Sequence, residues 1–158
     1  MPGIERLDPA RHDCSAFTCG EHALDRYLKA HAAQNQQEGV STTHVLVDAS
    51  DAVLGYFTLS AAQLELTQLQ EADRKRLPRY PVPAVRMGRL AIARSLQKKG
   101  YGELLVGHAV RRCLDMREAL GVRVMLVDAL PAAERFYLQY GFQPTVANPL
   151  TMYLPLGT

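Results

Sequence analysis

The chain has 158 residues, a formal net charge of +2, and a hydrophobic fraction of 47%. This apolar content suffices for one core, so we expect a single domain spanning residues 1–158. It has no charged-then-apolar N-terminal segment and no apolar run near the roughly 18 residues that cross a bilayer, which argues against secretion and membrane spanning and predicts a cytoplasmic protein.

The three cysteines, Cys14, Cys19 and Cys113, are an odd number at unequal spacings, which is typical of reduced thiols. His12 and His22 lie close in sequence to the first two, and these four side chains are of the types that bind zinc. Their spacing matches neither a Cys-x-x-Cys nor a His-x-x-x-His pattern, so we expect no metal.

The first half of the chain predicts a helix and then a hairpin. Residues 21–37 carry apolar side chains at helical spacing, with His31 interpreted as a residue at the edge of the core. Residues 42–47 and 52–66 are β-branched and apolar, and the turn residues 48–51 separate them. A short helix is expected over 68–77. Three prolines within 77–83 remove backbone donors and predict an extended connector.

The second half predicts a strand over 84–93, a glycine loop, and a helix over 103–120 that Gly121 ends. A strand over 122–127 and a short helix from Pro131 to Tyr140 follow, with Gly141 as the C-cap. Phe142 and residues 150–156 predict one or two last strands. This order of elements predicts a mixed α/β protein with helices packed on a sheet.

Charge is segregated along the chain. Residues 74–101 contain nine basic side chains and no Asp or Glu, which leaves the remainder at −7, from nine basic and sixteen acidic residues. The nine are Arg74, Lys75, Arg76, Arg79, Arg86, Arg89, Arg94, Lys98 and Lys99. Such segregation predicts a local positive field that attracts a polyanion. The alternative, a solvated face that keeps the protein in solution, predicts acidic residues interspersed with the basic ones.

The loop Gln97–Gly102, with the sequence QKKGYG, places two glycines directly before a helix. Unpaired N–H groups at a helix start attract anions, so we expect a phosphate-binding loop. A Walker loop would need Lys-Ser or Lys-Thr after a glycine, and a dinucleotide fingerprint would need a third glycine where Leu105 stands. Both of these nucleotide-binding patterns are therefore disfavoured.

Gln97-x-x-Gly100-x-Gly102 resembles the Arg/Gln-x-x-Gly-x-Gly/Ala motif of the GNAT N-acetyltransferases, and residues 133–142 resemble that family's helix ending in Phe-Tyr-x-x-x-Gly-Phe. The resemblance implies the GNAT fold, an α/β (mixed α+β) architecture whose mostly antiparallel sheet splays between its fourth and fifth strands, with helices on both faces. It implies acetyl-coenzyme A as cosubstrate. The implied contacts are Leu90, Ala91, Ile92, Gln97, Lys98, Lys99, Gly100, Tyr101 and Gly102.

Acetyl transfer to an amine needs a neutral nucleophile, a donor to the developing oxyanion and a proton for the departing thiolate. The resemblance places Tyr137 beside the leaving sulfur as that proton donor, and a backbone N–H of Leu90 or Ala91 as the oxyanion donor. We interpret Phe136, Tyr140 and Phe142 as core packing. No carboxylate stands out as a general base, which implies a water chain or an amine of low pKa.

Several further segments, among them residues 17–20, 55–60, 77–83, 88–91, 127–129 and 148–150, are similar to the acetyltransferase toxins of bacterial type II toxin–antitoxin modules. That resemblance implies acetylation of the α-amine of aminoacyl-tRNA, a ribbon-helix-helix antitoxin and a homodimer. The basic stretch supports an RNA substrate, because RNA needs phosphate contacts from Lys and Arg. The candidate contacts are Lys29, Arg76, Arg79 and Arg86.

The missing base also fits this substrate, because an esterified α-amine should titrate below the roughly 7.7–8.0 of a chain terminus, whereas lysine titrates near 10.4. Two other hypotheses stay open. One is a GNAT enzyme acting on a small amine or a protein N-terminus, which an acidic acceptor pocket would favour. The other is a non-catalytic module that binds acyl-coenzyme A or RNA, for which Tyr137 would be dispensable.

Overall fold

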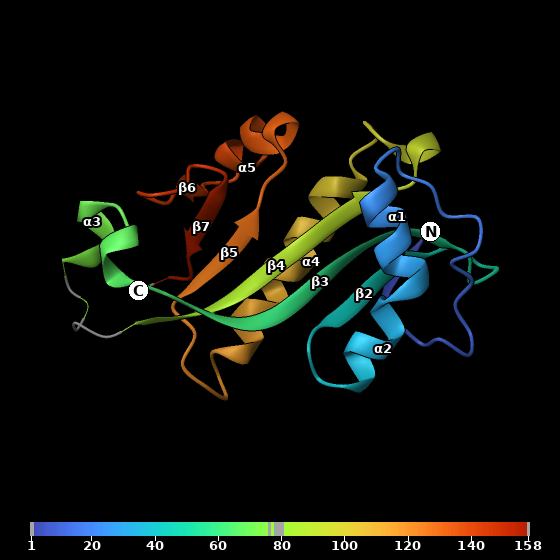
Figure 1. Ribbon diagram of the computed structural model, residues 1–158, viewed down its shortest axis with the longest axis horizontal. Coiled ribbons are helices and arrows are strands. Elements are labelled where there is room, and N and C mark those ends of the chain that lie inside the picture. Colours follow the sequence, from blue (N-terminus) through green and yellow to red (C-terminus); the bar gives the residue numbers. More distant parts are fainter. Residues whose placement is uncertain (1, 76, 78–80, 158) are drawn as a thin grey trace. The chain divides into compact units, whose positions relative to one another are not determined.

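The computed structural model describes residues 2–75, 77 and 81–157. Within these residues the strands form one seven-stranded sheet in the order β1-β2-β3-β4-β5-β7-β6 (Figure 1). The pairs β1–β2, β2–β3, β5–β7 and β6–β7 are antiparallel, whereas β4–β5 is parallel. The predicted mixed, mostly antiparallel sheet is confirmed.

The elements follow in chain order. The first are β1 (Gly3–Arg6), α1 (His22–Ala30), α2 (Ala32–Gln37), β2 (Thr42–Val47), β3 (Val53–Leu64), the 3-10 turn η1 (Leu66–Gln68), α3 (Glu71–Arg74) and β4 (Val82–Ile92). The 3-10 turn η2 (Arg94–Leu96), α4 (Tyr101–Met116), β5 (Val124–Asp128), the 3-10 turn η3 (Pro131–Ala133), α5 (Glu134–Gln139), β6 (Gln143–Pro144) and β7 (Thr151–Pro155) follow.

The chain divides into two compact units, and β3, β4 and α4 each contribute residues to both. The first unit runs to Ser60 and adds Arg89–Ala109. On one face of its strands, α1 and α2 pack in a core with Leu28 and Tyr56 among its members. On the other face the first turns of α4 cover β3, because a Cβ at Gly55 would lie 3.3 Å from Leu105 Cδ1 (Figure 1). Helices therefore cover both faces of the sheet in this unit.

The second unit comprises 61–88 and the chain from Val110 onward. Its core joins β4, β5 and β7 through Ala84, Leu126 and Tyr153, with Leu69 beside them. The described β4–β5 ladder pairs Ala84 with Val124 through Met87 with Val127, while β4 itself runs on to Ile92.

Several predicted boundaries were wrong. The helix predicted over 21–37 breaks at His31, which has φ −126° and is exposed rather than at the edge of the core. The break lets α2 turn toward the strands, where the Gln36 side chain donates to the Leu7 carbonyl (2.9 Å) and accepts from the Thr43 N–H (3.0 Å). The short strand β1, which pairs with β2, was not predicted.

Three other elements differ in extent. The helix predicted over 68–77 is the 3-10 turn η1 followed by the four-residue α3. Strand β4 begins at Val82 and so includes Pro83, which was assigned to the connector. Helix α4 begins at Tyr101 and ends at Met116, and Gly121 lacks the left-handed φ of a C-cap. The hairpin β2–β3 and the C-cap at Gly141, with φ +91°, are confirmed.

Among the described residues, none of the helices combines the length and the apolar character that crossing a bilayer would require.

Candidate active site

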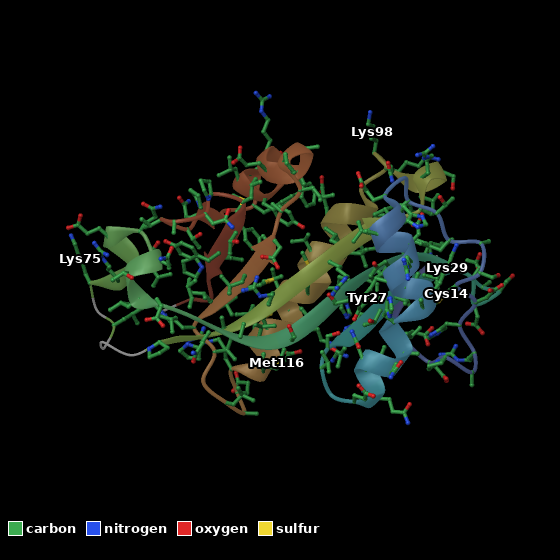
Figure 2. All side chains as sticks on the ribbon, in the orientation of Figure 1. Cys14, Tyr27, Lys29, Lys75, Lys98 and Met116 are labelled. Atoms are coloured by element: carbon green, nitrogen blue, oxygen red, sulfur yellow. The ribbon has the colours of Figure 1, made fainter. Side chains whose placement is uncertain are left out.

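The loop before α4 exposes a run of backbone donors. Gly100 has φ +90° and Lys98 has φ +64°, so the chain turns sharply between η2 and α4. The first backbone bond at the start of α4 runs from the Leu104 N–H to the Gly100 carbonyl (3.2 Å), so the N–H groups of Tyr101, Gly102 and Glu103 have no partner within that helix. Figure 2 shows the Lys98 side chain pointing away from the loop. The loop and the start of α4 therefore offer N–H groups and the positive end of a 16-residue helix to an anion.

The side chain of Gln97 holds this loop in place. Its Nε2 donates to the carbonyl of Cys19 (2.6 Å) and to that of Ile92 (3.0 Å). The first bond reaches 78 positions back along the chain, and the second reaches the end of β4. From the sequence we predicted that Gln97 contacts the cofactor through its backbone amide. The structure shows that its side-chain amide fixes the backbone of the loop.

A second segment, Thr18–Gly20, contacts the part of the chain that leads into the loop. The Thr18 carbonyl accepts the N–H of Arg94 (2.8 Å), and the N–H of Cys19 donates to the Asp25 carboxylate (2.9 Å). Gly20 has φ +97°, and a Cβ there would lie 2.8 Å from a guanidinium nitrogen of Arg94. The positive φ favours a glycine at this position, whereas the Arg94 guanidinium, at the end of a flexible side chain, could shift to admit a Cβ. Sequence patterns gave no sign of this contact beyond the Phe-x-Cys-Gly similarity.

The last residues of β4, Leu90, Ala91 and Ile92, lead directly into this region. Ala91 is buried, and Leu90 and Ile92 are half-buried. A Cβ at Gly55 would lie 3.0 Å from the Ala91 carbonyl oxygen, so β3 approaches β4 closely there. Arg89, the residue before them, stacks its guanidinium 3.5 Å from the centre of the Tyr27 ring.

Tyr137 lies on the buried side of α5. Only 4% of its surface is exposed, and its ring meets Phe136 and Phe142 edge to face at 5.2 and 5.4 Å. The carbonyl of Tyr137 accepts the N–H of Phe142 (3.2 Å), which closes the turn around Gly141. Burial, and after it the charge of Asp128, raises the pKa of Tyr137 well above its usual value. The phenol therefore keeps its proton at neutral pH and can act as a donor but not as a base.

Asp128, at the end of β5, forms an ion pair with Arg86, which we predicted from the sequence to contact RNA. Arg86 Nη1 lies 2.5 Å from Asp128 Oδ1, and the two side chains are 35% and 41% exposed. Asp128 was not among the predicted site residues. It is nevertheless the charged group whose field reaches Tyr137.

The other predicted RNA contacts are less well defined. Lys29 is exposed on α1, where Figure 2 labels it. Lys98 and Lys99 are exposed in the loop, and Arg76 and Arg79 lie outside the described residues. Of the seven described cations in the basic stretch, Arg86 and Arg89 already face partners of their own chain.

The histidines and cysteines of the N-terminal segment do not gather into one cluster among the described residues. Among the described residues, the side chains that lie close enough together to hold a cation are instead those of Glu5, His12 and Asp51. Arg11 lies among these side chains and pairs with Glu5 and with Asp51, and His12 Nδ1 accepts the N–H of Asp8 (2.9 Å). Because Nδ1 accepts this bond, neutral His12 carries its proton on Nε2, which disfavours a metal at that nitrogen.

All three cysteines are free thiols, as predicted. Burial raises the pKa of Cys19 to about 11 and that of Cys113 to about 12. Burial likewise raises the pKa of Cys14. These thiols are therefore protonated and poorly nucleophilic at neutral pH.

Comparisons with known proteins agree with this geometry. The model of the acetyltransferase (GNAT) domain matches residues 41–144. A tRNA-acetylating toxin of Mycobacterium tuberculosis is 32% identical over 143 residues, which cover 90% of this chain and 85% of the relative. Two solved structures of AtaT are similar over 98% of this chain.

AtaT complexed with acetyl-methionyl-tRNA has a TM-score of 0.92 at 34% identity, and 95% of that chain is covered. A tyrosine-to-phenylalanine variant of AtaT, bound to the C-terminus of the antitoxin AtaR and to acetyl-coenzyme A, has a TM-score of 0.84 at 32% identity, with 93% of that chain covered. The phosphate-type loop, the helix that carries Tyr137 and the matched domain together show that this chain belongs to the GNAT acetyltransferase family.

Proposed function

We propose that this protein is a toxin that transfers an acetyl group from acetyl-coenzyme A to the α-amine of aminoacyl-tRNA and thereby inhibits translation. The observation that carries the proposal is the glycine loop with the unpaired first-turn N–H groups of α4, within a chain that is similar over nearly its whole length to a toxin bound to acetylated aminoacyl-tRNA. That coverage of 98% also supports one acetyltransferase domain over residues 1–158.

The residues of the loop fit the pyrophosphate of acetyl-coenzyme A. We propose that backbone N–H groups from Lys98 to Gly102 contact it, because the N–H of Gln97 donates to the Arg94 carbonyl (3.4 Å) and Gln97 acts by fixing the loop. We further propose that Leu90, Ala91 and Ile92 pair with the pantetheine arm, and that Leu90 or Ala91 donates its N–H to the oxyanion. Lys98 and Lys99 add positive charge beside the phosphates. A relative bound to acetyl-coenzyme A supports this assignment.

Tyr137 is proposed as the acid of the reaction. The neutral amine adds to the thioester carbon to form the C–N bond, and the C–S bond then breaks with its electron pair on sulfur. Tyr137 donates its proton to that sulfur, while the proton lost by nitrogen passes to water, from which the tyrosine is reprotonated. Because burial raises its pKa, Tyr137 stays protonated between turnovers at neutral pH.

The RNA would be held by phosphate contacts from basic side chains. Arg86 already donates to Asp128, so among the four predicted contacts we assign this role to Lys29, Arg76 and Arg79. The charge segregation along the sequence supports the assignment.

The remaining assignments rest on the similarity to toxins. A relative bound to its antitoxin supports a neutralising antitoxin as partner, which we propose is of the ribbon-helix-helix type. We further propose that the protein is a homodimer and acts in the cytoplasm, where charged tRNA is found.

The test mixes purified protein, labelled acetyl-coenzyme A and charged tRNAs, and compares the wild type with Tyr137→Phe. We expect label on at least one charged tRNA, and a loss of about 10²–10⁴-fold in kcat for the variant. Tyr140→Phe, at the C-cap of the same helix, is the matched control and should stay active. If no charged tRNA is labelled, the proposal is wrong. Label found only on a small amine or a peptide N-terminus would indicate the other acetyltransferase hypothesis. Binding of acetyl-coenzyme A without any transfer would indicate a binding module.

A further inference from the structure

The segment of residues 66–75 is short and irregular, yet the second unit holds it closely. Its helix α3 has four residues, and a helix of this length is not stable by itself in water. Leu69, which is 1% exposed, anchors the segment in the core that contains Ala84 and Leu126. Tertiary contacts therefore decide where α3 lies and in which direction its side chains point.

Tyr153 of β7 supplies two of these contacts. Its side chain is buried in the same core, and its hydroxyl accepts the N–H of Gln70 (2.9 Å) and donates to Asp73 Oδ2 (2.5 Å). Gln70 is the N-cap of α3, and Asp73 is the third residue of the helix. One phenol oxygen thus holds α3 at two points. In Figure 1, α3 lies on the side of β6 and β7, as these bonds require.

Strand β6 and the loop after it hold the start of the same segment. Gln70 Nε2 donates to the Pro144 carbonyl (3.0 Å). Gln68 accepts the N–H of Val146 at its carbonyl (3.1 Å) and the N–H of Ala147 at its side-chain oxygen (2.9 Å). The two bonds made by the glutamine side chains join residues 74 and 79 positions apart. The segment is therefore ordered by the fold of the second unit and not by its own sequence.

The last part of the segment presents two cations, Arg74 and Lys75. Arg74 is half-buried, and Lys75, which Figure 2 labels, is exposed. The acidic side chains of α3 are Glu71 and Asp73, and among the described residues neither of them forms an ion pair with the two cations. Asp73 instead accepts from the neutral hydroxyl of Tyr153. Both cations are thus left available to an anion.

The charge pattern indicates which anion this is. Arg74 and Lys75 are the first two of the nine basic residues in the stretch 74–101, which contains no Asp or Glu and favours a polyanion. A surface segment that is already ordered loses less conformational freedom on binding than a flexible one. We propose that Arg74 and Lys75 bind RNA phosphates, and that Tyr153 is a positioning residue that holds them in place through Asp73 and the start of α3. The choice of RNA as the partner rests on the proposed function.

The experiment measures the binding of deacylated tRNA at several salt concentrations, so that it does not depend on acetyl transfer. Arg74→Gln and Lys75→Gln should each reduce the salt slope, the fall in the logarithm of the binding constant with the logarithm of salt concentration, by about 0.7–0.9. Arg111→Gln removes an exposed cation of α4 outside the basic stretch and should leave the slope unchanged. Tyr153→Phe keeps the ring, loses the hydroxyl and should weaken tRNA binding about threefold to tenfold.

Asp73 offers two variants of equal charge that separate position from electrostatics. Asp73→Asn keeps an oxygen that can accept from Tyr153, whereas Asp73→Leu has none. We expect Asp73→Asn to bind tRNA at least as tightly as the wild type, and Asp73→Leu to bind it about threefold to tenfold more weakly than Asp73→Asn. Tyr153→Phe should have little further effect when Arg74→Gln and Lys75→Gln are both present. In turnover it should raise KM for charged tRNA and leave KM for acetyl-coenzyme A unchanged.

Thermal unfolding checks that each variant is folded, and the two Asp73 variants keep the test valid if Tyr153→Phe unfolds. Equal tRNA affinity of Asp73→Asn and Asp73→Leu, wild-type affinity in Tyr153→Phe, or an undiminished effect of Tyr153→Phe without the two cations would overturn the positioning role. Salt slopes unchanged by Arg74→Gln and Lys75→Gln would overturn the phosphate contacts and leave this surface to another partner. If the wild type binds no tRNA, the inference is wrong. If it binds tRNA but acetylates no charged tRNA, the proposed function fails, and the binding measurements still decide the inference.

Discussion

Replacing Gln97 by alanine should weaken binding of acetyl-coenzyme A without touching the chemistry. The substitution removes the donor that bonds the Cys19 carbonyl at 2.6 Å and the Ile92 carbonyl at 3.0 Å. Two hydrogen bonds at about 0.5–1.5 kcal/mol each amount to about 1–3 kcal/mol, or fivefold to 150-fold in an equilibrium. Because Gln97 is exposed, the lower half of this range applies, and we expect KM for acetyl-coenzyme A to rise about tenfold.

The control variants change the donor capacity of the side chain together with its charge. Gln97→Glu has a similar size but cannot donate when ionised, and it places a negative charge beside the phosphates, so KM should rise further than with alanine. Gln97→Arg restores N–H donors and should stay within a few fold of wild type. Initial rates at varied acetyl-coenzyme A give KM and kcat for all four proteins. An unchanged KM in both the alanine and the glutamate variants would refute the idea that this side chain sets the geometry of the loop.

Three further predictions concern stability. Burial raises the pKa of Tyr153 to about 12, above the value of about 10 in the unfolded chain. The resulting contribution to the free energy of unfolding is complete below pH 10 and is lost as pH rises from 10 to 12. The unfolding free energy measured in urea should therefore fall less between about pH 9 and pH 11 in Tyr153→Phe than in the wild type. Gly55→Ala forces a methyl group to within 3.0 Å of the Ala91 carbonyl oxygen and should cost about 1–3 kcal/mol in urea unfolding, whereas wild-type stability would contradict this close approach. Arg89→Gln removes the cation from the face of Tyr27 and should lower the unfolding free energy by about 0.5–2 kcal/mol, an effect that should vanish in a Tyr27→Leu background.

Local chemistry explains which elements could be predicted from the sequence. The β2–β3 hairpin follows from two β-branched runs around a turn, and the end of α5 follows from Gly141, which adopts the left-handed conformation that glycine favours. Strand β1 has only four residues and lies at the edge of the sheet, so its pattern is too short to identify. The break at His31 depends on bonds from Gln36 to distant backbone, which periodicity does not contain.

The same division applies to the candidate site. Gly100 and the start of α4 are encoded within a few residues, so the motif indicated a phosphate loop. The contact of Gln97 with Cys19 joins residues 78 positions apart, and the pair of Arg86 with Asp128 joins residues 42 positions apart. From the charge pattern we predicted that Arg86 contacts RNA. Its acidic partner Asp128 lies 42 positions away, so the sequence around Arg86 contains no sign of the ion pair.

The stacking of Arg89 on Tyr27 has a consequence for how nucleic acid affinity should respond to ionic strength. Each phosphate neutralised by a protein cation releases condensed counterions, and the logarithm of the binding constant falls with the logarithm of salt concentration by about 0.7–0.9 per contact. A count from the sequence gives nine contacts for the basic stretch, but an arginine that lies flat on a tyrosine ring or pairs with a carboxylate is already engaged by its own chain and is less available to neutralise a phosphate. The salt slope of tRNA binding should therefore be shallower than the sequence composition suggests, and it measures how many of these cations folding has left to solvent.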